Sequence, residues 1–387
     1  MEFSLEQLAW DLEGLSPEEH GFTYLDLQRE PAGSGRLDGW VIPAKDLHDV
    51  AGMPTSLGHT QRAYLATTTD CFLEALEAEG AIIPGKSAAP ELGLRVDTEP
   101  VGYPHPDNPL WPGHTPGGSS GGAAVMVARG LVRAAHAGDG GGSIRVPAAA
   151  CGVVGFKPSG DDLSVPGFIT RTVEDQAFLH DIPLLKPTRA RIGVLTAPLF
   201  ADVAVAPVML RAVDEAAAAL RGLGYEVVPI DPYPAAAETF AAFQALFSTR
   251  LADLDFAEGY SAWLREIGRS ISPAQLADAR THAQGLPARL AHDWQVDALL
   301  SPMLAFDPPP RGTFTALEHA ENFEQQTRWS PWGSLFNVAR LPAVSLPWPV
   351  ARRQPVGVQL GGITLSDAPV LGLAAALSAT TASQYRH

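Results

Sequence analysis

The sequence predicts an α/β fold, and three observations support this prediction. Segments with the composition of strands alternate with amphipathic helices along most of the chain, which is the order typical of α/β proteins. The second half contains a strand, a helix and a further strand in the order of a βαβ unit. The 387 residues are 46% hydrophobic, which is enough to bury one large core or two ordinary ones. These features argue against an all-α or an all-β protein.

The first part of the chain is expected to alternate helices with short strands. Ser4 and Gln7 have the spacing of a helix capping box. Asp70 or a preceding threonine can cap a second helix, which Gly80 can close. Lys45 directly follows an expected strand, and side chains at strand ends are well placed for chemistry. The expected elements are a helix from Ser4, a strand at 40–42, a helix over 67–81 and a strand over 81–86.

The second part of the chain is expected to supply the βαβ unit and the last core strands. Ser272 and Pro273 fit the N-cap and first position of a helix. The expected strands lie at 189–197, 226–231, 296–303, 341–350 and 356–363, and the expected helices at 207–225, from Ser272 onward and at 366–382. Since no fixed-period repeat or low-complexity linker interrupts these elements, we expect one domain over 1–387. Within it we expect a catalytic core at about 38–160 and a C-terminal α/β half at about 188–387; a split near residue 196 is the alternative.

Composition limits the classes of partner. The formal net charge of −16 argues against nucleic acid or anionic lipid bound through a general basic field. The acidic N-terminus lacks the pattern of a signal peptide, and no run of about 18 apolar residues predicts a membrane span. Cys71 and Cys151 are the only cysteines, and two free thiols are the simpler interpretation. We expect a cytoplasmic monomer or homodimer that acts on a small molecule.

The rarity of lysine singles out four positions. The chain has 27 basic residues, of which only Lys45, Lys86, Lys157 and Lys186 are lysines. Arginine cannot lose its proton in a protein, whereas a buried lysine can do so and act as a base. By this argument alone, chance explains the presence of lysine at any one of these positions equally well.

The segment HTPGGSSGG at 114–122 places two serines among four glycines. Gly117 to Gly121 matches the G-x-S-x-G nucleophile elbow, as does the frame one residue later. That elbow requires a strand leading straight into the turn, and the prolines before it suit no central strand. A phosphate cradle is also disfavoured, because the lysine of a P-loop is missing. The pattern therefore leaves the role of Ser119 and Ser120 open.

A second glycine-rich turn, Asp139 to Ser143, can present backbone N–H groups toward one point. Without Cβ atoms, Gly140, Gly141 and Gly142 allow close approach, and such a nest suits a developing oxyanion. A flexible turn between buried segments is the plainer explanation of the same composition.

These two segments, taken together with others, closely resemble the amidase signature family. GGSSGGAAVMVARGL followed by GDGGGSIRVPAAACGVVGFKPS is similar to that family's signature. IPAKDLHDVAGMPTSLG, GAIIPGKSAAPELG and DNPLWP resemble its lysine segment and two further motifs, and FNVARLPAVSLPW with PVGVQLGG resembles its C-terminal motifs. The resemblance covers nearly the whole chain. It implies a mixed, largely central twisted β-sheet sandwiched by α-helices, and a hydrolase that cleaves amide C–N bonds.

The resemblance also implies a role for individual residues. Ser143 would be the nucleophile, Ser119 the bridging serine with a cis bond to Gly118, and Lys45 the base. Gly140, Gly141, Gly142 and Ser143 would supply the oxyanion hole. Such chemistry needs a base beside the serine and a lysine whose pKa is lowered toward about 7 to 8 by burial. No metal or cofactor is expected.

The remaining candidate residues are expected to be structural. Asp139 and Arg145 would support the loop through charge-assisted hydrogen bonds. Lys86 and Lys157 lie in the resembling motifs but are expected to act structurally, and Cys151 lies in an apolar run. His114 and His136 lack a metal-like partner at helical spacing.

Two departures from the family pattern leave the function partly open. Glycines 138 and 140 stand where the family has threonines, and the segment after Lys157 is short. An amidase for small carboxamides or aryl amides, with a possible esterase side activity, is the leading hypothesis. The alternatives are an amidotransferase-type subunit that works with a partner protein and a non-catalytic ligand-binding relative.

Overall fold

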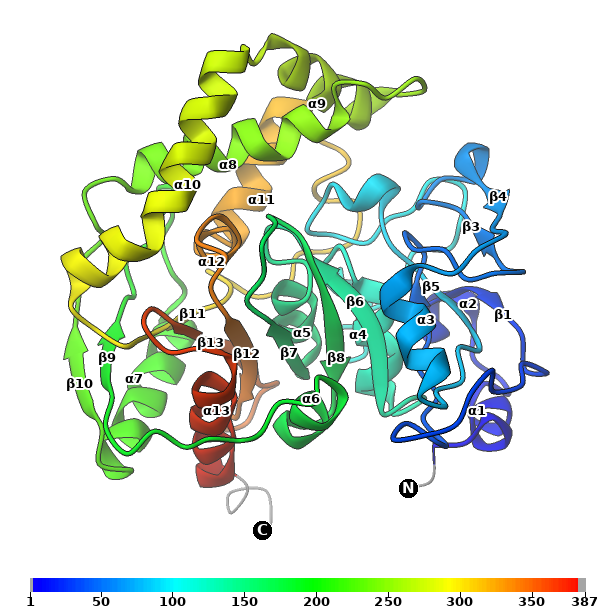
Figure 1. The fold of residues 1–387 in the computed structure, drawn as a ribbon, viewed down its shortest axis with the longest axis horizontal. Helices are drawn as coiled ribbons and strands as arrows, with labels where there is room; N and C mark the ends of the chain where they lie inside the picture. Colours follow the sequence, from blue (N-terminus) through cyan, green and yellow to red (C-terminus); the bar gives the residue numbers. More distant parts are fainter. Residues whose placement is uncertain (1–2, 382–387) are drawn as a thin grey trace.

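An eight-stranded mixed sheet forms the centre of the computed structural model, which describes residues 3–381 (Figure 1). The strand order is β10-β9-β11-β13-β12-β7-β8-β6, so strands from both halves of the sequence share one sheet. The neighbours β10, β9 and β11 run parallel, and the remaining pairs are antiparallel. A three-stranded sheet of order β1-β5-β2 and the β3-β4 hairpin lie in the N-terminal part.

The strands are β1 (Phe22–Leu25), β2 (Ala44–Lys45), β3 (Pro54–Thr55), β4 (Tyr64–Leu65), β5 (Gly85–Ser87), β6 (Ala134–Asp139), β7 (Val154–Lys157), β8 (Val165–Thr170), β9 (Arg191–Val194), β10 (Glu226–Pro229), β11 (Ala298–Pro302), β12 (Ala343–Trp348) and β13 (Val356–Gly362). The α-helices are α1 (Leu5–Asp11), α2 (Pro17–His20), α3 (Cys71–Ala78), α4 (Gly121–Arg129), α5 (Arg145–Cys151), α6 (Val173–Leu179), α7 (Pro207–Gly222), α8 (Ala236–Ser248), α9 (Gly259–Ser270), α10 (Pro273–Trp294), α11 (His319–Trp329), α12 (Leu335–Val338) and α13 (Asp367–Thr381). Short 3₁₀ helices cover Thr60–Arg62, Glu91–Gly93 and Thr249–Leu251.

Successive side chains of the buried strands pack into separate apolar clusters on the two faces of the sheet. In β11, Ala298 and Leu300 pack into one cluster with residues of α6, α7 and α13, whereas Leu299 packs with residues of α8, α10 and α12. Successive side chains of a strand point to opposite faces, so an apolar strand of this kind is buried on both sides. Helices α4 and α5 pack beside β6 and β8 in a third cluster. The mixed sheet between helices confirms the predicted fold class.

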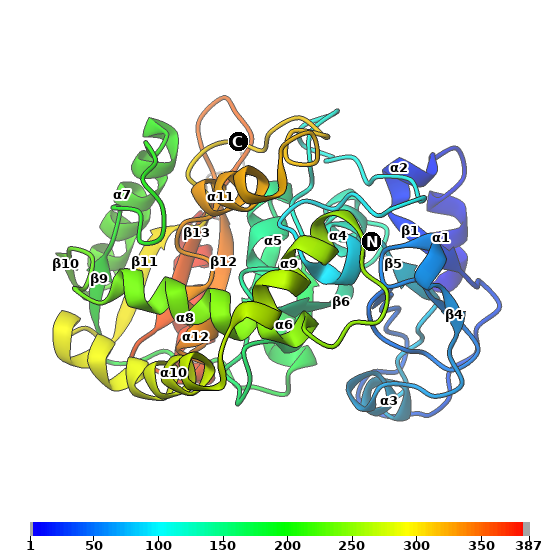
Figure 2. The ribbon, with the colours of Figure 1, turned by 90° about the horizontal axis from the view of Figure 1, so that it is seen from above.

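The helices α8, α9, α10 and α11 lie along the upper side of the molecule in Figure 1, the side from which Figure 2 looks down. The N-terminal elements α1, α2, α3 and β1 lie at the opposite side from α7 and β10. Helix α8 packs against α10, α12 and α9. This arrangement leaves the end of β6 facing the α8–α11 group.

Two strands in the N-terminal part begin later than predicted, directly after Pro43 and Pro84. The expected strand at 40–42 is wrong: Val41 makes only a single bridge to Ile82, and the regular strand β2 begins at Ala44. Likewise, the strand expected over 81–86 begins at Gly85, after Pro84. Proline has no N–H to donate, so the ladder is interrupted where each proline falls and resumes beyond it. Lys45 therefore lies within a strand rather than past its end.

The predicted helices are present, with small changes at their ends. Ser4 Oγ accepts a hydrogen bond from Gln7 N, but the Gln7 side chain donates to Asp11 instead of closing the capping box. Ser272 forms both halves of a capping box at the start of α10, and Pro273 occupies the first turn. The helix predicted for 366–382 forms over Asp367–Thr381, and Ala382 lies outside the described residues. Within residues 3–381, no helix is long and apolar enough to cross a membrane.

The βαβ unit is formed by β9, α7 and β10, with the two strands parallel as predicted. The predicted strands of the C-terminal half correspond to β9, β10, β11, β12 and β13. The segment 104–118, by contrast, contains no regular strand or helix, so nothing resembling a nucleophile elbow precedes Ser119. Cys71 is exposed and Cys151 is buried, and both thiols are free.

Candidate active site

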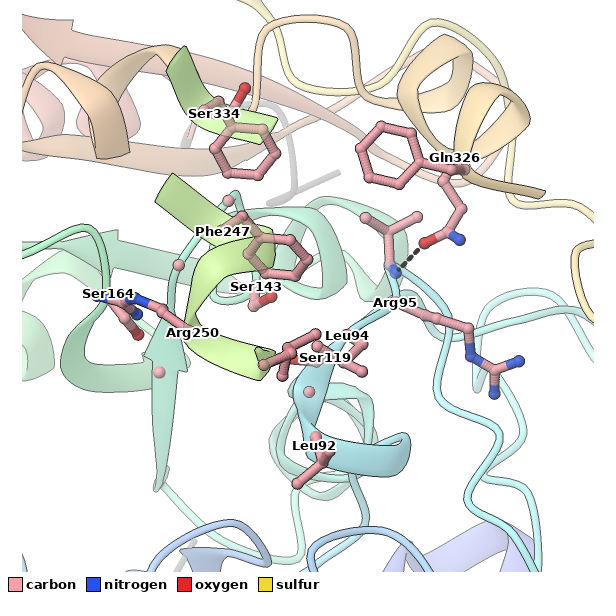
Figure 3. A pocket seen from close by; sticks show the side chains of 18 of the residues that line it. Leu92, Leu94, Arg95, Ser119, Ser143, Ser164, Phe247, Arg250, Gln326 and Ser334 are labelled. Carbon is pink, nitrogen blue, oxygen red and sulfur yellow. Dashed lines mark hydrogen bonds between the residues drawn. The ribbon is translucent and has the colours of Figure 1, made fainter. Parts of the chain in front are cut away.

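Three elements bring the predicted site residues to one cavity of about 370 Å³. Lys45 comes from β2, Ser119 from the residue pair before α4, and Ser143 from the loop between β6 and α5. All three side chains line the cavity, together with Gly138, Gly140 and Gly141. Figure 3 shows Ser119 and Ser143 on this cavity, with Phe247 and Gln326 also facing it.

Lys45 and Ser119 are directly hydrogen-bonded. Lys45 Nζ donates to Ser119 Oγ at 2.7 Å and approaches the carbonyl oxygen of Gly138 at 3.4 Å. Both side chains are only 2% exposed, so the contact is shielded from water. The backbone N of Lys45 donates to His136 Nδ1 at 3.2 Å, which holds the strand against β6.

Burial changes the protonation of Lys45. Removal of the ammonium from water lowers the pKa of Lys45 to about 7, and the negative charge of Asp139 only partly opposes this effect. A lysine with this pKa is neutral in a large fraction of molecules near pH 7. In that state its nitrogen has a free lone pair and can accept a proton.

Ser143 is placed close to this pair but is not bonded to it. Its backbone carbonyl accepts a hydrogen bond from Ser120 N at 3.3 Å, which ties the two serine segments together. Within residues 3–381, no hydrogen bond joins the hydroxyls of Ser119 and Ser143. The side chain of Ser143 is partly exposed to the cavity and is therefore accessible to a ligand.

The peptide bond between Gly118 and Ser119 is cis, as the family resemblance implies. Gly118 also lies against the backbone of the preceding loop: a methyl group in place of its hydrogen would lie 2.1 Å from the carbonyl oxygen of Asp97. Glycine is required at this position because any larger residue would overlap that carbonyl group.

Asp139 organises the loop that carries Ser143. Its carboxylate accepts hydrogen bonds from the backbone N of Gly142 at 2.7 Å and of Ile144 at 3.1 Å. Arg145 completes the arrangement, since its Nε and Nη2 donate to the same carboxylate at 3.0 and 2.9 Å. Both residues are fully buried. The loop is thus folded around one ion pair.

The same ion pair is anchored to the C-terminal half. Arg145 donates to Gln359 Oε1 at 2.6 Å and to Asn337 Oδ1 at 2.7 Å, and Asn337 donates back to the Asp139 carbonyl at 2.9 Å. Burial alone would raise the pKa of Asp139, but the charge of Arg145 and the hydrogen bonds from Arg145 and Asn337 outweigh it and hold the pKa below its ordinary value. The carboxylate therefore stays ionised at neutral pH.

The backbone N–H groups of the loop from Gly140 to Ser143 differ in whether they already donate a hydrogen bond. The N–H of Gly142 is engaged by Asp139, and the φ of +123° at Gly142 favours glycine at this position. Within the described residues, no hydrogen bond is found for the N–H groups of Gly140, Gly141 and Ser143. Gly140 and Gly141 line the cavity beside Ser143, so the unengaged amides lie at its wall.

The remaining lysines and histidines of interest have structural partners. Lys86 donates to His48 O at 2.5 Å and Thr55 Oγ1 at 2.9 Å, and Lys157 donates to the carbonyls of Pro158 and Leu341. Burial lowers the pKa of Lys157 to about 7, and the charge of Arg145 acts in the same direction. Burial also keeps the pKa of His136 well below its ordinary value.

Metal ligation has no support from these histidines. His136 Nδ1 accepts the amide N–H of Lys45, and His114 Nδ1 contacts the carbonyl of Pro112 at 3.0 Å. Within residues 3–381, no group of three or more His, Cys, Asp or Glu side chains could hold a metal ion.

The cavity wall contains residues that the sequence reasoning missed. The cavity is also lined by the phenylalanines 200, 240, 243, 247 and 323, together with Gln326 and Arg250. Phe240, Phe243 and Phe247 share one face of α8, and their spacing of three and four residues could have indicated this face. Gln326 Oε1 accepts a hydrogen bond from Val96 N at 2.7 Å, drawn in Figure 3.

Comparison with known proteins shows the family to which the chain belongs. The model of the family described as Amidase matches residues 22–184. The protein named "Putative amidase AmiB2" of Mycobacterium tuberculosis is 32% identical over 376 residues, which cover 88% of this chain and 81% of that protein. "Putative amidase AmiA2" of the same organism is also 32% identical, with coverage of 92% and 82%. The chain belongs to the amidase signature family, and it is a hydrolase of amide C–N bonds.

Solved structures show the same fold. The 6-aminohexanoate cyclic dimer hydrolase superposes with a TM-score of 0.87 at 25% identity, covering 99% of this chain and 94% of that one. A bacterial aryl acylamidase of the amidase signature family gives a TM-score of 0.83 at 23% identity, with coverage of 98% and 93%.

Proposed function

We propose that this amidase hydrolyses small carboxamides or aryl amides, with an esterase side activity, through an acyl-enzyme on Ser143. The observation that carries the proposal is the 2.7 Å hydrogen bond from Lys45 Nζ to Ser119 Oγ at a cavity that Ser143 also lines. A serine hydroxyl attacks poorly until a neighbouring base takes its proton. The lowered pKa of Lys45, about 7, suits that task at neutral pH.

In the first half-reaction neutral Lys45 takes the proton of Ser119, and Ser119 takes that of Ser143. The Ser143 oxygen then forms a bond to the amide carbon, and the carbonyl electrons move to its oxygen. The relay requires the Ser143 side chain to rotate toward Ser119, and hydrogen bonds of this kind often form only when substrate is bound. The C–N bond breaks as the relay returns its proton to the leaving nitrogen.

The oxyanion is held by backbone amides of the glycine loop. The predicted donors are Gly140, Gly141, Gly142 and Ser143. The N–H of Gly142 already donates to Asp139, so we assign the main contribution to the amides that have no partner in the described residues. Each lost donor in comparable sites costs about 2.7 to 4 kcal/mol of barrier. In the second half-reaction, water activated by the same relay attacks the ester and releases the acid.

Asp139 and Arg145 are proposed as positioning residues. They touch no substrate atom in this scheme, because both are fully buried behind the loop. Their ion pair fixes the direction of the loop amides through the bonds to Gly142 and Ile144. No cofactor takes part in the proposed reaction, and the monomeric or homodimeric state stays a prediction.

The test is hydrolysis of aryl amides and esters by the purified chain, together with labelling by a fluorophosphonate probe. Ser143→Ala is expected to abolish both, since the nucleophile is gone. Ser120→Ala is the matched control: among the described residues the Ser120 hydroxyl forms hydrogen bonds only with the backbone of Gly138, at 3.4 Å, and activity should remain within a few-fold of wild type. Labelling that persists in Ser143→Ala but disappears in Ser119→Ala would overturn the assigned roles. Hydrolysis by the chain alone would also remove the need for an amidotransferase partner.

A further inference from the structure

A second cavity of about 460 Å³ adjoins the site cavity. The two share five lining residues, the phenylalanines 200, 240, 247 and 323 and Thr327. These residues therefore form a wall with the serines on one side and the second cavity on the other. We call this wall the phenylalanine partition and the second cavity the distal chamber.

Phe243 connects the serine loop to the phenylalanine partition. A methyl group placed on Gly141 would lie 2.9 Å from Cζ of Phe243, so the Phe243 ring rests directly on the loop. Phe243 stacks with Phe247 at a centroid distance of 5.4 Å and with Phe240 at 6.0 Å. Phe240 in turn stacks with Phe200 at 5.3 Å. A continuous set of aromatic rings thus leads from the loop to the distal chamber.

The floor of the distal chamber is apolar. Trp263, Leu264 and Ile267 come from α9, and Ala320 from α11. Trp263 also packs against Phe323 of the partition at 6.1 Å. A surface of this composition stabilises an apolar ligand by removing it from water.

The charged groups at the distal chamber do not favour a charged ligand. Glu324 pairs with Arg328 at 2.9 Å on consecutive turns of α11. Asp202, the third charged lining residue, is exposed and keeps its hydration. A ligand carboxylate or ammonium would have to give up its hydration for a site lined mainly by aromatic and aliphatic side chains. The distal chamber therefore suits an uncharged group.

We propose that the distal chamber binds the uncharged apolar arm, alkyl or aryl, of a substrate whose amide group lies at Ser143. This inference rests on the proposed function and names the substrate class: amides whose arm is long enough to pass the phenylalanine partition. The rings of Phe200, Phe240 and Phe323 are only partly buried, so rotation about their side-chain bonds can open the passage. Phe243 fixes the start of the passage at the serine loop.

The test uses two series of uncharged anilides and alkyl amides, in which either the acyl or the amine arm grows from two to ten carbons. For one of the two series, kcat/KM is expected to rise about fourfold per added methylene once the arm enters the chamber, the ratio that corresponds to about 0.8 kcal/mol. Ala320→Trp, an exposed position that lines only the distal chamber, should remove this rise for long arms and leave the two-carbon substrates unchanged. Ala237→Trp, exposed on α8 and lining neither cavity, is the matched control and should behave as wild type.

A binding measurement separates this inference from the proposed function. Alkyl phenyl ketones have the arm and the carbonyl group but no bond to hydrolyse, and calorimetry gives their Kd for wild type and for both tryptophan variants. Affinity that increases with arm length in wild type and in Ala237→Trp, but not in Ala320→Trp, supports the distal chamber even if the nucleophile lies elsewhere. Affinity independent of arm length, or equal in the two variants, would overturn it even if short amides are hydrolysed.

Discussion

At the scale of single residues, the environment of Lys45 combines burial, a serine partner and a lowered pKa at the wall of the site cavity. Its side chain is buried, its nitrogen has a serine hydroxyl at 2.7 Å, and its pKa is lowered to about 7. An arginine in the same place would remain charged at every accessible pH. A lysine at this position can therefore accept and release a proton near neutral pH, whereas an arginine could not.

The pH profile of hydrolysis tests this property. In the proposed mechanism the neutral form of Lys45 is the base, so kcat/KM is expected to increase as pH rises through about 7 and then to level off. Lys45→Arg should lose at least about a hundredfold in kcat at all pH values, a loss within the usual contribution of acid–base catalysis. Retained activity in Lys45→Arg, or a profile that falls between pH 6 and 8, would place the base elsewhere.

At the scale of elements, the loop between β6 and α5 takes its shape from partners that are distant in sequence. Arg145 is held by Asn337, at α12, and by Gln359, in β13. The sequence predicted that Asp139 and Arg145 fix the loop, but it did not indicate Asn337 and Gln359 as hydrogen-bond partners of Arg145. Both lie in the motifs FNVARLP and VGVQLGG, whose resemblance to the family gave no role for them. A contact across about 200 residues leaves no local signal in composition or periodicity.

Local signals predicted five helices and the strands β9 to β13, because periodicity and capping act over a few residues, but they gave none of the strands β6, β7 and β8 or the helices α4, α5 and α8. The N-cap Ser272 with Pro273 at the start of α10, and the core strand β11, were predicted from such patterns. The misplaced strand at 40–42 shows their limit, since Pro43 and Pro84 decide where regular pairing starts. The side-chain hydrogen bond between Lys45 and Ser119 joins two segments 74 residues apart, and only the family resemblance anticipated it.

Removal of Arg145 is expected to destabilise the protein strongly. Arg145→Met leaves the Asp139 carboxylate buried without its partner, and the loss of one member of such a pair costs about 3–5 kcal/mol. Urea unfolding should show this cost as a lower transition midpoint. The control is Arg328→Met, which breaks the more exposed pair with Glu324 and should change the unfolding free energy by about 0.5 kcal/mol or less. Equal effects of the two substitutions would contradict the buried role of Arg145.

At the scale of the whole molecule, two buried lysines couple folding to pH. Lys45 and Lys157 both have a pKa of about 7 in the fold, against the ordinary value of 10.5. Between these values the unfolded chain binds more protons than the folded chain, so the free energy of unfolding increases with pH. Below about pH 7 both states are protonated and this dependence ends.

Urea unfolding at several pH values between 7 and 9.5 measures this coupling. We expect the free energy of unfolding to rise across the range, with each lysine contributing up to about 1.4 kcal/mol per pH unit. A third buried lysine, Lys86, also has a pKa lowered by burial, so Lys157→Met should reduce the slope by roughly a third to a half. A slope that is flat in wild type, or unchanged in Lys157→Met, would mean that these lysines stay charged inside the fold.

The long-range support of Arg145 also has a consequence during synthesis. A ribosome makes the serine loop more than 200 residues before it makes Gln359, so a nascent chain carries Arg145 and Asp139 without their C-terminal partners. Strands β12 and β13, which complete the sheet between β7 and β11, emerge last as well. The contacts that anchor Arg145 to the C-terminal half are therefore complete only after β13 has been made, more than 200 residues after the serine loop itself.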